Sequence, residues 1–214
     1  MDIKKLISKN RIISEQIKAD ELEVLLRELE VVLQINVEGD VVELGCYEGT
    51  SALFFQRMIE ELAPDKKLWL YDSFEGLPDK TKEDASESGN LFKQGALKAS
   101  KARLAKNFFK ANLKIPEIRK AWFYELDTED LPEKICFAFF DGDFYESIAD
   151  SLKLVWPKMS EGSAIMIDDY ETSKLPGVKK AVDEFARLNN LVIKSDKSLA
   201  TLRTQHHDAG LFQC

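Results

Sequence analysis

The sequence predicts a doubly wound α/β fold, in which a mostly parallel sheet of about seven strands carries helices on both faces. Short apolar segments alternate along the chain with longer amphipathic ones, which is typical of parallel strands joined by helices. Near the C-terminus, two extended segments bracket Ser195-Asp-Lys-Ser198, which predicts a closing antiparallel hairpin. The chain of 214 residues is long enough to bury one core of this kind.

The first 36 residues are predicted to form a helical segment that precedes the main domain at residues 37–214. Within this segment, leucines at helical spacing share one stripe, namely Leu22, Leu25, Leu26, Leu29 and Leu33. Such a stripe packs on the core of its own chain or on a second subunit. We therefore expect the segment to serve as a lid or as the face of a homodimer.

The predicted strands are short, and the next elements along the chain are helices or polar loops. The strands occupy residues 40–45, 67–72, 118–124, 135–141, 163–168, 191–194 and 199–203. The helices between them occupy residues 50–62, 91–110, 147–156 and 178–189. The strand at 135–141 has no polar residue before its aspartate, which predicts a central strand buried on both faces. Residues 73–90 are polar and turn-rich, and we expect a mobile loop there.

Composition narrows the classes of partner. Lys and Arg total 30 against 38 Asp and Glu, and the net charge of -8 argues against nucleic acid and an anionic membrane surface. No apolar run approaches the roughly 20 residues of a membrane span. The N-terminus lacks the continuous apolar region of a secretory signal, so a cytoplasmic protein is expected. Cys46, Cys136 and Cys214 are predicted to be reduced thiols, and His206-His207 to be a solvated tail.

Four of the predicted strands end in a glycine or an aspartate, namely Gly45, Asp72, Asp141 and Asp168. In open α/β sheets, ligands bind beyond the carboxyl ends of the strands. The sequence therefore predicts that these four positions meet in one crevice.

The first two strand ends suit a nucleoside. Gly45 and Gly49 form a GxxxG turn between a strand and a helix, which is neither the GxGxxG fingerprint nor a Walker A loop. Asp72 is placed to accept hydrogen bonds from ribose hydroxyls. The alternatives are a tight turn without a ligand and a solvated or helix-capping aspartate.

The other two strand ends are acidic. Asp141 and Asp143 lie in Phe140-Asp-Gly-Asp, and Asp168 and Asp169 follow Ile167. Carboxylates that are brought together repel one another unless protons or a cation neutralise them. An all-oxygen donor set favours Mg²⁺, Mn²⁺ or Ca²⁺. The alternative is that these aspartates cap helices or turns.

These motifs also carry a family resemblance. Glu43-Leu-Gly-Cys-Tyr-Glu-Gly-Thr-Ser51 resembles motif I of the class I S-adenosylmethionine-dependent methyltransferases. Asp72-Ser-Phe-Glu-Gly-Leu-Pro78 resembles the DSFEGLP signature of the macrocin O-methyltransferase (TylF-like) family. Phe140-Asp-Gly-Asp-Phe-Tyr-Glu-Ser147 is similar to its DxDxYxS signature, and Ile167-Asp-Asp-Tyr170 to its DDY. All four stand in family order.

The resemblance implies a Rossmann-like methyltransferase fold and an O-methyltransferase that uses S-adenosylmethionine and Mg²⁺ or Mn²⁺. The acceptor it implies is a hydroxyl of a sugar or another small natural product. Carried over by position, the S-adenosylmethionine site comprises Glu43, Gly45, Tyr47, Gly49, Thr50 and Ser51, with Asp72 on the ribose and Ser73 and Phe74 beside the adenosine. The metal ligands would be Asp141, Asp168 and Asp169, and Asp143 would be the catalytic base.

Other functions stay open at this point. The acceptor could be a catechol or another small phenol, or the chain could be a non-catalytic scaffold that binds S-adenosylmethionine. A nicotinamide-dependent oxidoreductase is disfavoured by the missing GxGxxG. The row Trp122-Phe-Tyr124 is interpreted as strand packing, with Trp122 as an alternative neighbour of the adenine.

Overall fold

The computed structural model describes residues 1–86 and 92–204, and their strands form one seven-stranded sheet. The strand order is β3-β2-β1-β4-β5-β7-β6, with β7 antiparallel to both of its neighbours. The strands are β1 (Asp40–Leu44), β2 (Leu68–Asp72), β3 (Glu117–Lys120), β4 (Ile135–Phe140), β5 (Met159–Ile167), β6 (Lys194–Asp196) and β7 (Leu199–Arg203). This arrangement confirms the predicted doubly wound α/β fold with a C-terminal hairpin.

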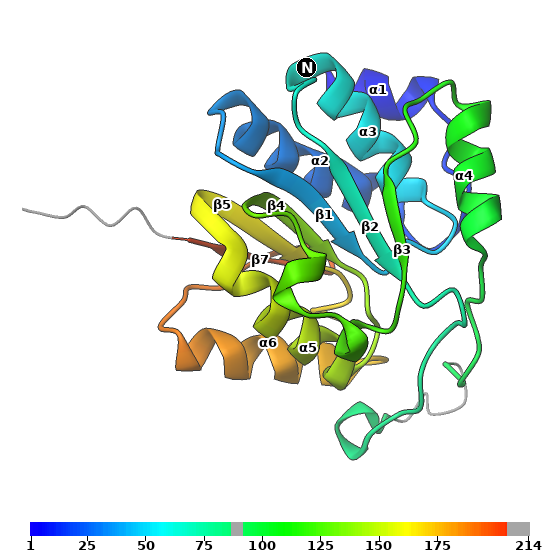
Figure 1. Cartoon of the computed structure of the whole chain (residues 1–214). Coiled ribbons are helices and arrows are strands. Elements are labelled where there is room, and N and C mark those ends of the chain that lie inside the picture. The colour runs from blue at the N-terminus through cyan, green and yellow to red at the C-terminus, as the bar shows by residue number, and fades with distance from the viewer. Residues whose placement is uncertain (87–91, 205–214) are drawn as a thin grey trace, which may run out of the picture.

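The helices cover both faces of the sheet (Figure 1). They are α1 (Ile3–Lys9), α2 (Ala19–Gln34), α3 (Thr50–Leu62), α4 (Lys101–Lys110), α5 (Tyr145–Val155) and α6 (Pro176–Leu188). Side chains of α2, α3 and α4 share one hydrophobic cluster with one face of the sheet, and those of α5 and α6 share a second cluster with the other face. Every residue of β4 is buried, because this strand lies in the middle of the sheet beneath both layers.

The leucine stripe of α2 packs within its own chain. All five leucines are buried, and they belong to the same cluster as Phe137 and Phe139 of the sheet. The first of the two alternatives for this stripe is therefore confirmed, since these side chains are not free to face a partner. The roles of residues 1–36 as a lid or a dimer face, and the boundary at residue 37, stay predictions.

The register of the parallel strands aligns their carboxyl ends. Leu44 of β1 is level with Tyr71 of β2 and with Phe140 of β4, and Phe140 is level with Ile167 of β5. The residue after each member of this row lies at the same edge of the sheet, and these residues are Gly45, Asp72, Asp141 and Asp168.

Three predicted elements differ from the structure. The helix predicted at residues 91–110 begins only at Lys101, because Ser100 caps it by accepting a hydrogen bond from the Arg103 N–H and the backbone of residues 94–97 turns beforehand. The strand predicted at 118–124 ends at Lys120 and is followed by a short 3-10 helix at Phe123–Glu125.

The third difference is at the last strand pair. The strand predicted at 191–194 is instead β6, at Lys194–Asp196. Leu191 follows the end of α6 and packs back on it, since its N–H donates to the Ala186 carbonyl. Cys46 and Cys136 are buried free thiols, whereas Cys214, His206 and His207 lie outside the described residues.

A buried aspartate docks the segment that follows β2. Asp84 is 1% exposed, and its Oδ1 accepts a hydrogen bond of 2.7 Å from the Tyr145 N–H at the start of α5. Its Oδ2 accepts from the N–H and the hydroxyl of Thr81. A Cβ at Gly177, in the first turn of α6, would lie 1.9 Å from Asp84 Oδ1. The described part of the predicted loop at 73–90 is therefore held against the starts of α5 and α6.

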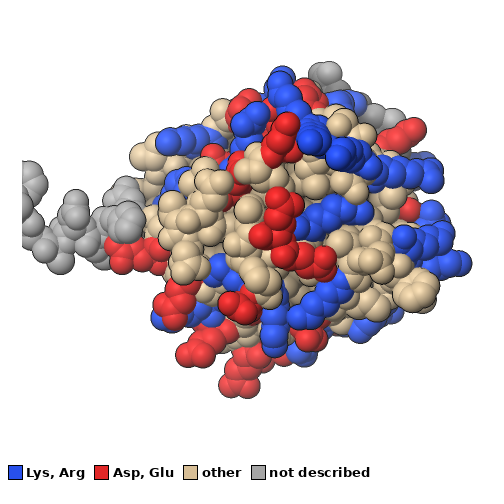
Figure 2. All heavy atoms as spheres, turned by 90° about the horizontal axis from the view of Figure 1, so that it is seen from above, with Lys and Arg blue, Asp and Glu red and all other residues tan. Residues whose placement is uncertain are grey.

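The surface carries both signs of charge. On the face formed by the N-terminal helices, acidic and basic side chains are interspersed (Figure 2). None of the described helices has the length and apolarity that a membrane span requires.

The Asp84→Asn substitution should destabilise the fold by about 2 kcal/mol or more. The asparagine would present an amide NH₂ to at least one donor that the carboxylate now accepts, leaving buried donors unpaired. Urea unfolding monitored by circular dichroism measures the change. Asp79→Asn, on the exposed part of the same loop, is the matched control, and equal stability of the two variants would contradict the docking role of Asp84.

Candidate functional site

A pocket of about 720 Å³ opens at the carboxyl edge of the sheet. The row of strand ends forms its floor, with Gly45, Asp72, Asp141 and Asp168 among its lining residues. Its walls include residues from seven other segments, within 15–21, 76–78, 92–97, 122–124, 146–150, 171–175 and 197–198. The four motifs found in the sequence thus converge on one cavity, as their placement at strand ends predicted.

The glycine turn is required by a close approach of two strand ends. Gly45 has φ +92°, and a Cβ at this position would lie 2.0 Å from the Asp141 carbonyl oxygen. Only glycine allows β1 to end this close to the end of β4. Gly49 has φ +90° and precedes the first residue of α3.

Asp72 binds the backbone of this turn. Its Oδ2 accepts hydrogen bonds from the N–H groups of Cys46 at 3.1 Å and Tyr47 at 2.9 Å. Its Oδ1 accepts from the Phe74 N–H at 2.6 Å. Burial raises the pKa of Asp72, and these three hydrogen bonds lower it by stabilising the charged form. The carboxylate is therefore held in one orientation at the pocket floor.

Five of the residues predicted to bind S-adenosylmethionine do not line the pocket. They are Glu43, Gly49, Thr50, Ser51 and Phe74, whereas Gly45, Tyr47, Asp72 and Ser73 line it. Glu43 is fully buried in β1 and accepts a short hydrogen bond from the Ser51 hydroxyl. Its other oxygen has no partner among the described residues, and burial raises its pKa to about 8.

The acidic end of the pocket contains a compact group of carboxylates. Asp141, Asp143 and Asp169 each offer one oxygen, and these three atoms lie within 4.8 Å of one another. Asp143 and Asp169 have positive φ values of 60° and 57°, a conformation that costs energy for residues other than glycine. We call Asp141, Asp143 and Asp169 the carboxylate triad.

Asp168 lines the pocket beside the triad but is oriented by other groups. Its Oδ1 accepts hydrogen bonds from the Asp169 N–H at 2.8 Å and from the Ser198 hydroxyl at 3.0 Å. The sequence assigned Asp168 to the metal and Asp143 to the proton, whereas the structure groups Asp143 with Asp141 and Asp169. Both assignments stay predictions.

Burial and mutual repulsion favour the protonated forms of these acids. Burial and, to a lesser extent, repulsion by the neighbouring carboxylates raise the pKa of Asp143 to about 8 and that of Asp169 to about 7. Burial also raises the pKa of Asp168 to about 6 and that of Asp141 well above its usual range. A cation would relieve this repulsion. Closely spaced carboxylate oxygens fit a hard divalent ion such as Mg²⁺ or Mn²⁺.

An aromatic wall closes the side of the pocket near β3. Trp122 and Tyr124 stack with ring centroids 6.3 Å apart and planes 11° apart, and both line the pocket. The prediction that this row packs within a strand is wrong, because β3 ends at Lys120.

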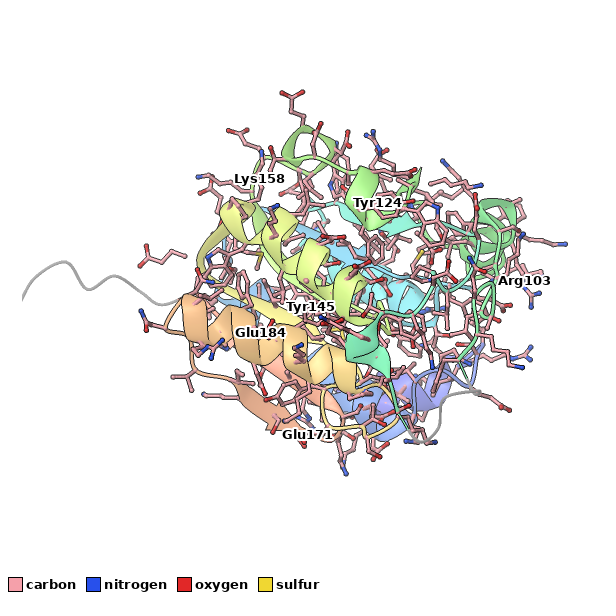
Figure 3. The ribbon with its side chains drawn as sticks, turned by 90° about the horizontal axis from the view of Figure 1, so that it is seen from below. Arg103, Tyr124, Tyr145, Lys158, Glu171 and Glu184 are labelled. Atoms are coloured by element: carbon pink, nitrogen blue, oxygen red, sulfur yellow. The ribbon has the colours of Figure 1, made fainter. Side chains whose placement is uncertain are left out.

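Two tyrosines after the acidic motifs have structural partners. Figure 3 shows Tyr145 and Glu184 pointing toward one another from α5 and α6, and the tyrosine hydroxyl donates to the Glu184 carboxylate at 2.7 Å. The Tyr170 hydroxyl donates to Asp183 at the same distance. The first hydroxyl therefore connects α5 to α6, and the second connects the turn after β5 to α6.

Sequence reasoning missed the walls contributed by the two ends of the fold. Glu15, Gln16, Lys18 and Glu21 line the pocket from the N-terminal side, and Ser198 lines it from the hairpin turn. No local motif marks these residues. The sequence predicted a closing antiparallel hairpin but not the strand beside which it pairs.

Comparison with known proteins identifies relatives of this chain. The family model described as "Macrocin-O-methyltransferase (TylF)" matches residues 14–198. Demethyldecarbamoylnovobiocin O-methyltransferase of Streptomyces niveus is 29% identical over 163 residues, which are 73% of this chain and 62% of that protein. Mycinamicin III 3''-O-methyltransferase of Micromonospora griseorubida is 28% identical over 165 residues, which are 73% of this chain and 64% of that protein.

A third relative, from Streptomyces olivaceus, is 8-demethyl-8-(2,3-dimethoxy-alpha-L-rhamnosyl)-tetracenomycin-C 4'-O-methyltransferase. It is 28% identical over 148 residues, which are 66% of this chain and 57% of that protein. This chain thus spans less than two thirds of the length of the curated relatives it matches. Among solved structures, the O-methyltransferase NovP superposes with a TM-score of 0.78 at 26% identity, over 89% of this chain and 81% of that one.

The pKa values of the acidic group predict how stability depends on pH in EDTA. An unfolded aspartate has a pKa of about 3.9, so the folded chain retains protons that the unfolded chain has lost. The free energy of unfolding should therefore fall as the pH rises from about 4 through the folded pKa values of about 6, 7 and 8. Asp143→Asn should flatten the fall between pH 6 and 8, by up to about 1.4 kcal/mol per pH unit.

Urea unfolding at a series of pH values checks this expectation. Asp196→Asn, which changes an exposed aspartate of β6 outside the pocket, should retain the slope of the unchanged protein. A slope that is the same in all three proteins would contradict the assigned origin of the pH dependence.

Proposed function

This chain belongs to the macrocin O-methyltransferase (TylF) family, and we propose that it transfers the methyl group of S-adenosylmethionine to a hydroxyl of a sugar or another small natural product. One observation carries the proposal. A single pocket joins a nucleoside-type floor, made of the glycine turn and Asp72, to the carboxylate triad. A methyl donor and a hydroxyl acceptor need this proximity in order to react.

The end of the pocket near β1 and β2 suits the donor. Asp72 Oδ1 accepts one hydrogen bond, from the Phe74 N–H, and so retains a lone pair for a ribose hydroxyl. Gly45, Tyr47 and Ser73 line the pocket beside it. Trp122 offers a flat face on the adjoining wall for the adenine ring. S-adenosylmethionine, when bound there, supplies an electrophilic methyl group on sulfur.

The acidic end suits the acceptor. Asp141, Asp168 and Asp169 would hold Mg²⁺ or Mn²⁺, which, when bound, lowers the pKa of an acceptor hydroxyl and orients it. The Asp143 carboxylate lies in the triad with Asp141 and Asp169, and we assign it to receive the proton of that hydroxyl. The pKa of Asp143, about 8 without an ion, would fall when a cation binds beside it, and the ionised carboxylate could then take up a proton near neutral pH.

The proposed reaction is a direct transfer of the methyl group from sulfur to oxygen. The acceptor oxygen attacks the methyl carbon in line, a C–O bond forms, and the S–C bond breaks. The hydroxyl proton passes to Asp143. The products are a methyl ether and S-adenosylhomocysteine.

The names of the relatives favour a sugar-bearing acceptor over a phenol. The name of the S. olivaceus relative specifies a rhamnosyl group and a 4'-O position. A panel that compares glycosylated natural products with catechols tests this choice. Turnover of catechols alone would favour the alternative acceptor class.

Isothermal titration calorimetry should detect micromolar binding of S-adenosylmethionine and of S-adenosylhomocysteine. Asp72→Asn should weaken that binding about tenfold or more, because it removes a charged acceptor and loosens the turn that Asp72 holds. Asp79→Asn should bind as the unchanged protein does. Absence of binding, with Mg²⁺ and with EDTA alike, would contradict the proposed cosubstrate.

Asp143→Asn should lower the rate of methyl transfer about 100-fold or more, because the amide cannot accept the hydroxyl proton. Binding of S-adenosylmethionine should persist in this variant, as titration calorimetry would show. Asp196→Asn, outside the pocket, should retain the rate. Full activity of Asp143→Asn would remove Asp143 from the role of base.

A further inference from the structure

Ser198 connects two carboxylates from distant parts of the chain. Its hydroxyl oxygen lies 3.0 Å from Asp168 Oδ1, at the end of β5, and 3.0 Å from Glu21 Oε1, in the first turn of α2. Ser198 itself lies in the turn between β6 and β7, next to Lys197. Its backbone carbonyl accepts a hydrogen bond from the Glu171 N–H, so the turn also holds the segment that follows Asp169.

The contact with Ser198 limits which oxygen of Asp168 can bind a ligand. Its Oδ1 already accepts the Asp169 N–H at 2.8 Å, and the Ser198 hydroxyl is a second donor to the same atom. Two donors use the two lone pairs of that oxygen, and only Oδ2 stays available to a ligand. Asp168 is therefore prepared to bind through one oxygen.

The Ser198 hydroxyl has a second possible acceptor, Glu21. A serine hydroxyl carries one proton and donates it to one acceptor at a time. Glu21 Oε1 also accepts from Lys18 Nζ at 3.3 Å, and Oε2 accepts from the Lys18 N–H at 3.0 Å. Glu21 thus has other donors, whereas among the described residues Ser198 is the side-chain donor to Asp168.

We propose that Ser198 is a positioning residue, whose hydroxyl orients Asp168 for a divalent cation by donating its proton to Asp168 rather than to Glu21 of the N-terminal wall. The inference rests on the proposed function, because it takes Asp168 as a ligand. A charge-assisted hydrogen bond to a ligating carboxylate fixes its rotamer before the ion arrives. Loss of such an outer contact typically weakens metal binding about 10-fold to 100-fold.

Binding of Mn²⁺, followed by the electron paramagnetic resonance signal of the free ion, tests the proposal without methyl transfer. Ser198→Ala should bind Mn²⁺ about tenfold more weakly than the unchanged protein. Ser198→Thr retains a hydroxyl and should restore the affinity. Ser195→Ala, which removes an exposed hydroxyl three residues away on β6, is the matched control and should bind normally.

Glu21→Gln separates positioning from a general structural role. The glutamine amide can donate to the Ser198 oxygen, which leaves the serine proton for Asp168, and a glutamine still suits the capping box at the start of α2. Because this substitution also removes a negative charge from the pocket lining, its affinity for Mn²⁺ should fall, but less than that of Ser198→Ala. Weakening in Glu21→Gln equal to that in Ser198→Ala would overturn the inference.

The two proposals fail in different ways. If Asp141→Asn and the unchanged protein bind Mn²⁺ alike, the proposed cation site is wrong. If Asp141→Asn abolishes binding and Ser198→Ala binds normally, the site stands and the role of Ser198 is wrong. Should Ser198→Ala not fold, Ser198→Cys keeps the volume with a weaker donor, and normal affinity in that variant would equally overturn the role.

Discussion

The alignment of four parallel strands at their carboxyl ends determines where every candidate functional group lies. Backbone hydrogen bonds continue one residue beyond the row formed by Leu44, Tyr71, Phe140 and Ile167. The N–H of Gly45 donates to Tyr71, that of Asp141 to Leu44, and that of Asp168 to Phe140, each at 2.9 Å. These hydrogen bonds extend the sheet pairing to the backbone of the first residue of each turn. A shift of one strand by one residue would reverse the faces of its side chains and separate the glycine turn from the acids.

The turns beyond that row supply the chemistry at some cost in backbone energy. Tyr47, Phe74, Asp143 and Asp169 all have positive φ, and each lies within three residues of a strand end. Asp72 helps to offset this cost on the donor side, because its carboxylate binds the N–H groups of Cys46, Tyr47 and Phe74. Conformations that are strained in isolation persist where surrounding contacts determine them. The hydrogen bonds around the pocket and the register of the strands therefore act together to hold the turns in place.

The sequence predicted the fold and the floor of the pocket because both depend on local patterns. Apolar runs ending at Gly45, Asp72, Asp141 and Asp168 are visible in the chain, and the topology rule for open sheets brings such ends together. The walls were not predictable in the same way. Asp84 and Ser198 contact residues far away in sequence, and their neighbours show no periodicity or motif that indicates those contacts.

The predictions that failed did so where tertiary contacts override propensity. Residues 92–100 contain good helix formers, yet the N–H of Gly95 donates to the Leu77 carbonyl and the N–H of Leu77 donates to the Ala96 carbonyl. These pairings with the loop after β2 turn the chain before Ser100 can begin α4. Trp122 and Tyr124 have the aromatic character of a strand, but they follow its end and stack on one another instead.

The contacts between α2 and the terminal hairpin can form only late in the synthesis of this protein. Three such contacts are those of Lys197 with Asp20 at 3.2 Å, Ser198 with Glu21, and Arg203 with Glu28. The second of these joins residues 177 positions apart. On the ribosome, α2 emerges long before its partners in the hairpin, and contacts of such separation close late. A nascent chain that has reached Asp169 already contains all the acids of the floor, but its pocket lacks one wall until β7 has been added.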